Sequence, residues 1–222
     1  MITSHVYATP GEYDTTLTIT DPDGQAQQIS KTIKIGQVPK VNIISPIENI
    51  TFSVGQVIRL QGEAYDFLGN PIPEDQLTWE VRQHHAQHFH PFLDITQGNN
   101  FDLYPAPKPE DYLAATNSFL KIILTATDEY GLSNTFSMDV QPNIVMVNVT
   151  TAPSGLDIVV DDFSMETPEL FTSWDGFNLP VRVDDQPPYL FRSWSDGDKN
   201  RTRNIPIVSV SYTHLTLPTI LL

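Results

Sequence analysis

The sequence contains no cysteine among its 222 residues, which excludes disulfide bonds and a cysteine nucleophile. It does not exclude an oxidising compartment, because many secreted β-modules fold without disulfides. The Gly-x-Ser-x-Gly elbow and the Gly-x-x-x-x-Gly-Lys phosphate loop are also missing. Adjacent carboxylates such as Glu110-Asp111 and Asp184-Asp185 would point to opposite faces of a strand, which does not suit acid–base catalysis. We therefore expect that this chain is not an enzyme.

Basic residues are scarce as well. The chain has 12 lysines and arginines against 27 aspartates and glutamates, a formal net charge of −15. A surface this acidic repels phosphate backbones, so we expect no nucleic-acid partner. It can attract cations, calcium included, although acidic residues also serve solubility alone. No apolar run approaches the roughly 20 residues of a membrane-spanning helix, so we expect no membrane span, and no signal peptide opens the sequence.

Apolar residues with a helical period are the last missing feature, and threonine- and valine-rich runs favour strands instead. In the first segment one face of a strand would carry Tyr13, Thr15, Leu17 and Ile19. The same alternation recurs from Ile58 to Ala64 and from Leu120 to Ala126. The sequence therefore predicts an all-β fold.

Each of these three segments ends at an Asp-x-x-Gly turn: Asp21-Pro22-Asp23-Gly24, Asp66-Phe67-Leu68-Gly69 and Asp128-Glu129-Tyr130-Gly131. The aspartate side chain can accept backbone N–H groups two residues on, and glycine can close the hairpin. Repeated strands with such turns are typical of β-sandwiches. We expect tandem immunoglobulin-like β-sandwich modules: a truncated sandwich at residues 1–37, an immunoglobulin-like or cadherin-like sandwich at 38–142 and a small, truncated β-module at 143–209.

The first segment carries a longer pattern: His5-x-Tyr7-x-x-Pro10-Gly11-x-Tyr13-x-x-x-Leu17-x-Ile19-x-Asp21-x-x-Gly24. Over residues 1–36 it resembles the C-terminal half of a polycystic-kidney-disease (PKD) domain. The resemblance implies an immunoglobulin-like sandwich from an extracellular protein, used as a spacer or adhesive module. Because the pattern leads straight into a hairpin, we expect the first module to be truncated.

Further motifs are Leu77-Thr78-Trp79-Glu80-Val81, Pro91-Phe92, Leu124-Thr125-Ala126-Thr127-Asp128, Ser154-Gly155-Leu156 and Phe191-x-Ser193-Trp194-Ser195-Asp196-Gly197. Over most of residues 39–205 they resemble the C-terminal accessory region of bacterial glucose/sorbosone dehydrogenase-like proteins. In that family catalysis belongs to a β-propeller that binds pyrroloquinoline quinone (PQQ). No propeller sequence is present here, so the resemblance implies an accessory region and carries over no catalytic residue.

The final residues, 210–222, form a separate case. They begin Val210-Ser211-Tyr212-Thr213-His214-Leu215-Thr216-Leu217-Pro218-Thr219 and look like the translation of a transposon-end sequencing adapter. We interpret them as an artefact, to be left out of fold reasoning. On that interpretation the last module is also truncated, near Ser209. The alternative is a genuine apolar strand.

Four of the six histidines lie in His84-His85-Ala86-Gln87-His88-Phe89-His90. If Leu77, Trp79 and Val81 face inward, an extended chain would put His84, His88 and His90 on one side. Three neutral imidazoles can hold zinc or copper, with Glu80 as a fourth ligand or an outer acceptor. The alternatives are a polar hairpin without metal and a pH sensor.

Two further ligand sites are open on the sequence alone. The first is a calcium site, because aspartates at strand ends could supply oxygen ligands. These aspartates are Asp21, Asp23, Asp66 and Asp128, and turn capping alone also explains each of them. The second is a stacking platform for sugar rings, formed by Trp174, Tyr189, Phe191 and Trp194. The alternative is that these rings belong to the core, as aromatic residues in a small sandwich more often do.

These observations indicate a non-catalytic part of a larger secreted protein, located in the extracellular space, in the periplasm or at the cell surface. Its modules would act as spacers, adhere to cell-surface proteins or bind glycans, and would contact neighbouring domains of the same chain. One alternative is the accessory region of a PQQ-dependent sugar dehydrogenase. Another is a metal-binding module built on the histidine cluster.

Overall fold

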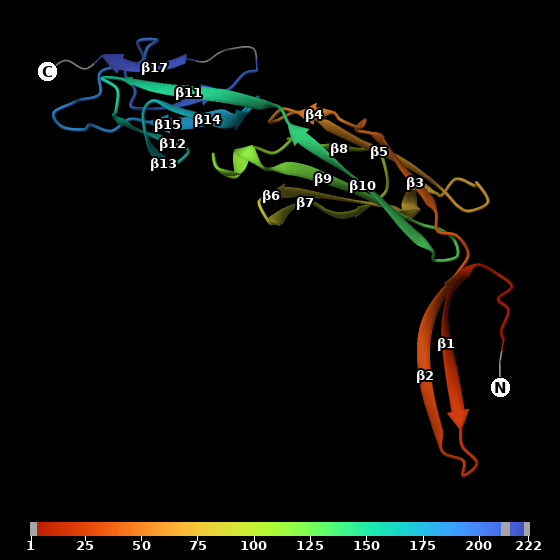
Figure 1. Ribbon diagram of the computed structural model, residues 1–222. Coiled ribbons are helices and arrows are strands. Elements are labelled where there is room, and N and C mark those ends of the chain that lie inside the picture. Colours follow the sequence, from red (N-terminus) through yellow and green to blue (C-terminus); the bar gives the residue numbers. More distant parts are fainter. Residues whose placement is uncertain (1–3, 210–213, 220–222) are drawn as a thin grey trace.

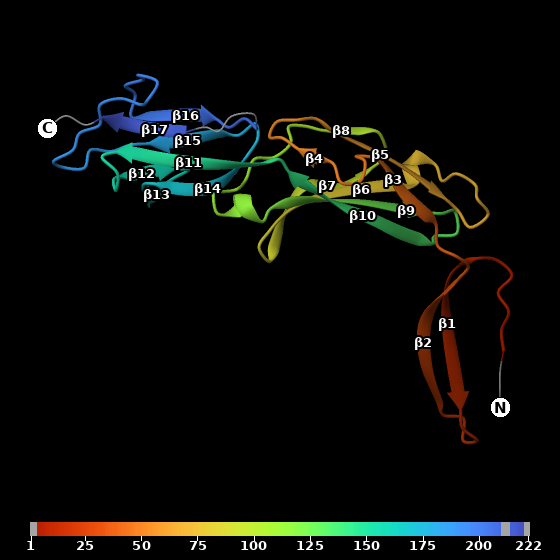
Figure 2. The same cartoon turned by 45° about the horizontal axis from the view of Figure 1, so that its top comes forward.

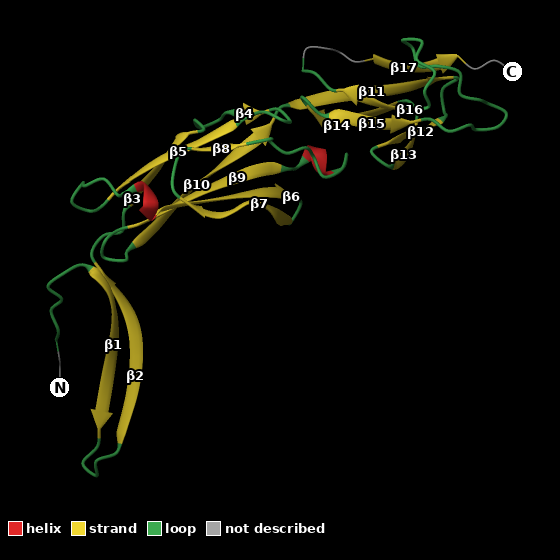
Figure 3. Cartoon of the chain, turned by 180° about the vertical axis from the view of Figure 1, so that it is seen from behind, coloured by secondary structure: helices red, strands yellow, loops and turns green. Residues whose placement is uncertain are grey.

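The structure is a computed structural model that describes residues 4–209 and 214–219. Within these residues the fold is all-β, as the alternating pattern predicted, with several antiparallel sheets. The helical content there is two short 3-10 helices, Glu74–Gln76 (η1) and Ala114–Thr116 (η2), drawn red in Figure 3. In this described part, no helix is long and apolar enough to cross a membrane.

The first sheet is a hairpin of β1 (Gly11–Thr20) and β2 (Ala26–Ile35) that extends away from the rest of the chain (Figure 1). Its register sets Leu17 opposite Ile29, so the predicted apolar face exists. Leu17, Ile19 and Ile29 are nevertheless 50–68% exposed, and residues 14–32 are all exposed. Tyr7 contacts Tyr13 and Thr15 at the start of this face, whereas its Leu17, Ile19 and Ile29 side chains stay exposed among the described residues.

The middle of the chain contains two sheets. One has the order β4 (Thr51–Phe52), β10 (Ser133–Pro142), β9 (Phe119–Thr127), β6 (Leu77–His85) and β7 (His88–Gln97). The other has the order β3 (Lys40–Ser45), β5 (Ile58–Tyr65) and β8 (Phe101–Leu103). All neighbours are antiparallel except β4 and β10, which pair in parallel.

Both middle sheets contribute to one apolar core. The inward positions of β9, Leu120 to Ala126, are fully buried, as the alternation predicted, and they share the core with Leu60 of β5. Gly62 permits the close approach: a Cβ there would lie 2.2 Å from Leu124 Cδ2, well inside contact distance. Close packing of this kind leaves no room for an extra methyl group.

The C-terminal part also contains two sheets around a second core. One sheet has the order β14 (Glu169–Trp174), β11 (Ile144–Ala152) and β17 (His214–Thr219). The other has the order β13 (Phe163–Glu166), β12 (Asp157–Val160), β15 (Asn178–Arg182) and β16 (Thr202–Pro206). Strand β17 pairs in parallel with β11. It covers residues 214–219 of the segment interpreted as adapter, whereas residues 210–213 and 220–222 lie outside the described residues.

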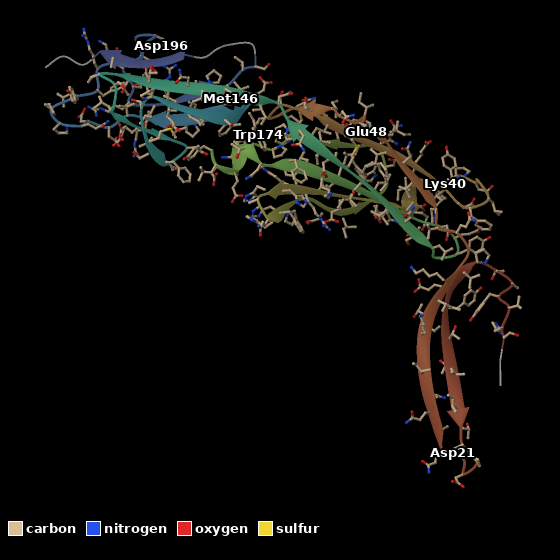
Figure 4. All side chains as sticks on the ribbon, in the orientation of Figure 1. Asp21, Lys40, Glu48, Met146, Trp174 and Asp196 are labelled. Atoms are coloured by element: carbon tan, nitrogen blue, oxygen red, sulfur yellow. The ribbon has the colours of Figure 1, made fainter. Side chains whose placement is uncertain are left out.

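The two cores meet at residues 174–176. Trp174 belongs to β14, yet its side chain is fully buried in the middle core, edge-on to Phe52 with ring centroids 5.6 Å apart. Its indole N–H donates to the carbonyl of Ala115 at 2.8 Å. Asp175 accepts the backbone N–H of Val54 at 2.8 Å. Strand β14 therefore stabilises both parts of the chain, at the place labelled Trp174 in Figure 4.

The three Asp-x-x-Gly turns share one hydrogen-bond pattern. In each, the glycine N–H donates to the aspartate carbonyl at 3.0–3.1 Å, and the aspartate N–H donates to the carbonyl four residues on at 2.9 Å. Each aspartate Oδ1 also accepts the N–H groups two and four residues later. Gly24, Gly69 and Gly131 have φ between +77° and +88°, which favours glycine. The turn prediction is confirmed.

Asp66 provides a pH-dependent test of this turn. The side-chain amide of Asn70, helped by backbone N–H groups, holds the pKa of Asp66 below its usual range. The charged carboxylate therefore stabilises the fold above the unfolded-state pKa of about 3.9 and loses that contribution as pH falls through the lower folded-state value. As the pH is lowered from about 6 to about 3, we expect the melting temperature of Asp66→Asn to fall less than that of the parent protein. Thermal denaturation followed by circular dichroism measures the two slopes.

Asp94→Asn, at an exposed position of β7, is the matched control and should behave like the parent protein. Equal pH slopes for Asp66→Asn and the parent would show that the Asp66 charge adds nothing to stability.

Candidate metal centre

The histidine cluster lies at the tip of the β6–β7 hairpin, which turns back through Ala86 and Gln87. The register sets His85 opposite His88 and Gln83 opposite His90. Directly opposite residues of an antiparallel pair share a face, and so do residues two apart on one strand. His85, His88 and His90 therefore point to the same side of the hairpin.

The three imidazoles converge together with Glu110. One ligand atom from each of the four residues lies within 4.8 Å of all the others. His85 Nε2 and His90 Nε2 are 3.2 Å apart. Glu110 Oε2 lies 2.5 Å from His85 Nε2 and 3.3 Å from His90 Nε2. The ring centroids of His85 and His88 are 3.9 Å apart.

These spacings suit a tetrahedral ion. Zinc–nitrogen and zinc–oxygen bonds of 2.0–2.2 Å separate the ligand atoms of a tetrahedron by about 3.3–3.6 Å. The His85–His90 distance of 3.2 Å and the His90–Glu110 distance of 3.3 Å already lie near that range. The shorter His85–Glu110 contact would have to lengthen by a fraction of an ångström. A set of three imidazoles and one carboxylate matches zinc in charge and softness.

Glu110 reaches the cluster from the loop after β8. The side-chain amide of Gln83 on β6 donates to the carbonyl of Lys108 at 3.0 Å and so ties this loop to the hairpin. Asp111 accepts the N–H of Ala114 at 2.7 Å, which fixes the start of η2. The hairpin turn is held from the other side, where Ala86 N–H donates to Asn117 Oδ1 at 3.3 Å. Both halves of the cluster are therefore anchored by backbone contacts.

His84, one of the three predicted ligands, lies on the opposite face of the hairpin. Its ring stacks on Phe119 with centroids 4.9 Å apart and lies 5.2 Å from Phe89. Burial lowers the pKa of His84, and its Nε2 has no hydrogen-bond partner. Of the predicted trio, the structure brings His88 and His90 together and replaces His84 by His85. The reason is the two-residue turn, which shifts the alternation by one position between the strands.

Glu80, proposed from sequence as a fourth ligand, is engaged elsewhere. Both of its carboxylate oxygens accept hydrogen bonds from the guanidinium of Arg82, one of them at 2.9 Å. Glu110 takes the position that Glu80 was expected to fill. The local pattern carries no signal for Glu110, because 20 residues and a proline-rich loop separate it from His90.

A groove of about 1140 Å³ opens beside the cluster, between the middle and C-terminal parts of the chain. His90 and Glu110 line it directly, and about half of each side chain is exposed. One wall is the loop Tyr104–Glu110, and residues of β15 and β16 form the other. Figure 2 shows the order of these parts, with the middle sheets next to the C-terminal sheets. The metal candidate thus borders this groove.

The predicted calcium ligands do not converge in the same way. Asp21, labelled in Figure 4, lies at the tip of the first hairpin, and Asp23 belongs to the same turn. Asp66 and Asp128 instead border one hollow of the middle part. Among the described residues these aspartates form no group of converging ligand atoms. Asp128 Oδ2 is buried without a hydrogen-bond partner, because Leu132 stands where Asn70 donates to Asp66 in the sister turn. Calcium at these turns stays a prediction.

The predicted aromatic platform does not form. Trp174 is fully buried in the middle core, while Trp194, 3% exposed, is buried in the C-terminal core with Phe191 packed against it. The structure therefore assigns the two tryptophans and Phe191 to packing, the alternative that the sequence left open, whereas Tyr189 is half-buried and belongs to neither core. The physical reason is that a large ring gains more from burial between sheets than from exposure on a surface.

Comparison with protein-family models and with curated proteins finds no match for this chain. The site's chemistry therefore has to be argued from its own residues.

Proposed function

We propose that this chain is a zinc-binding pair of β-modules whose metal centre is formed by His85, His88, His90 and Glu110. The observation that supports it is the convergence of four ligand atoms of the right chemistry within 4.8 Å of one another. Three imidazoles bring no charge of their own when neutral, and one carboxylate partly neutralises a divalent ion. Four protein ligands would fill a tetrahedral zinc site, as in structural zinc centres.

The surrounding architecture would be two immunoglobulin-like β-sandwiches, preceded by the hairpin of a third module. What supports this finer assignment is that two sheets share each core and that three Asp-x-x-Gly turns repeat one hydrogen-bond pattern. The resemblances to a PKD domain and to the accessory region of glucose/sorbosone dehydrogenase-like proteins point the same way. In this proposal the modules belong to a secreted or surface protein and bind or space without catalysis.

Zinc titration of the purified full chain tests the metal centre. After treatment with EDTA and its removal, isothermal titration calorimetry should show about one zinc ion bound per chain, because a preformed four-ligand site binds tightly. Inductively coupled plasma mass spectrometry of the dialysed complex should give the same stoichiometry. Calcium and magnesium, which prefer oxygen ligands, should not compete at millimolar concentration. Less than about one-tenth of an equivalent of retained zinc would refute the proposal.

A further inference from the structure

The groove beside the metal centre shares residues with it. Two of its lining residues, His90 and Glu110, are also candidate zinc ligands, so a bound ion would face the groove. Zinc can accept a fifth ligand, and both candidate ligands that line the groove, His90 and Glu110, are about half exposed. A molecule in the groove could therefore coordinate the metal directly.

A second positive charge, that of Lys108, lines the same groove. Lys108 lines the groove two residues before Glu110, and its ammonium is 5.6 Å from the centroid of the Phe177 ring on the opposite wall. Among the described residues it forms no direct ion pair with a carboxylate, although its charge acts on the carboxylate of Asp161. With zinc bound, a chain of net charge −15 would present two cations along this groove, beside the carboxylates of Asp102 and Glu110. That arrangement favours a ligand with carboxylate groups.

The walls of the groove discriminate between kinds of acidic ligand. Pro105, Pro107 and Pro109 have no backbone N–H, and both backbone groups of Ala106 are already bonded, to Gln56 and Gly55. This wall therefore offers no edge on which a peptide could add a strand. The opposite wall carries the exposed amides of Asn178 and Asn204, which lie on one face of β15 and β16. Amides and ring faces suit the hydroxyls and apolar faces of sugar rings.

We infer that the groove binds an acidic oligosaccharide, with its uronate carboxylates held by the zinc ion and by Lys108, which face the same groove. This inference rests on the proposed zinc centre and adds the class of ligand that the centre serves. Phe92 on the β7 wall and Phe177 beneath Lys108 supply apolar surface along the groove. Neutral sugars would lack the carboxylate that both cations require.

Calorimetry with tri-galacturonate tests the inference on the full chain. The zinc-loaded protein should bind tri-galacturonate, and removal of zinc should weaken binding at least tenfold. Lys108→Gln should weaken it about three- to tenfold while leaving zinc affinity unchanged, because Lys108 is not among the converging ligands. The fully methyl-esterified trisaccharide, which has the same rings without the charge, should not bind.

Each contrary result would overturn a different part of the inference. If the chain takes up zinc normally and does not bind tri-galacturonate, the groove assignment fails and the zinc centre stands. Equal affinity with and without zinc, or for Lys108→Gln and the parent protein, overturns the two-cation anchor. Equal binding of a tri-glutamate peptide overturns the choice of saccharide. If zinc itself does not bind, the proposed function fails first.

Discussion

Replacing Trp174 by alanine is expected to lower the free energy of unfolding by about 3–5 kcal/mol, the range for removing a fully buried large aromatic side chain. Trp174 is fully buried, packs edge-on against Phe52 and donates its indole N–H to Ala115. The substitution would leave a cavity in the middle core and an unsatisfied carbonyl beside it. The effect reaches across the molecule because β14 belongs to the C-terminal sheets.

The cooperativity of unfolding should change as well. With Trp174 in place, we expect the middle and C-terminal parts to unfold together in differential scanning calorimetry, since they share this side chain. In Trp174→Ala the two parts should separate into two transitions. Met146→Ala, on the neighbouring strand β11 and about half exposed, is the control and should change stability by less than about 0.5 kcal/mol. A single transition at an unchanged temperature in Trp174→Ala would show that the junction contributes little.

Replacing His85 by alanine should weaken zinc binding at least about 100-fold. Structural zinc sites bind with roughly 10–16 kcal/mol, so one of four ligands accounts for about 3 kcal/mol on average, and each 1.4 kcal/mol is a factor of ten. His90→Ala and Glu110→Gln should weaken binding in the same direction. Calorimetric titration of each variant with zinc gives the affinities directly.

His84→Phe is the control that separates the structure from the sequence-based trio. Phenylalanine keeps a ring against Phe119 and Phe89 but removes both imidazole nitrogens. The variant should bind zinc as the parent protein does, because His84 points to the other face of the hairpin. Loss of zinc in His84→Phe with retention in His85→Ala would restore the predicted set of His84, His88 and His90. It would also mean that the hairpin register differs from the one described.

Only part of the metal centre could be predicted from the sequence. The local density of histidines points to residues 84–90, and two of the three predicted ligands, His88 and His90, are in the cluster. Which remaining histidine joins them depends on where the chain reverses. Ala86-Gln87 lacks the asparagine–glycine or aspartate–glycine signature that would place a two-residue turn there. Ala86 adopts φ +48° all the same, held by the surrounding strands.

The burial of the aromatic residues could likewise not be predicted from the sequence. The sequence analysis grouped Trp174 with Trp194 as candidates for one sugar-stacking platform. The structure assigns them to two different cores, and the ring that meets Trp174 is Phe52, far back in the chain. Contacts between residues so distant in sequence leave no local pattern from which they could be read.

The amino-acid sequence alone determined what is local: strands, from side chains that alternate with a period of two, and three hairpin turns, from an aspartate and a glycine three residues apart. The tertiary structure decided what depends on several segments meeting: the face on which each histidine lies, the arrival of Glu110, the exposure of the first hairpin and the joining of two cores through Trp174. The physical reason is that hydrogen bonds within a turn involve neighbours in the chain, whereas metal ligation and core packing require side chains that only folding brings together.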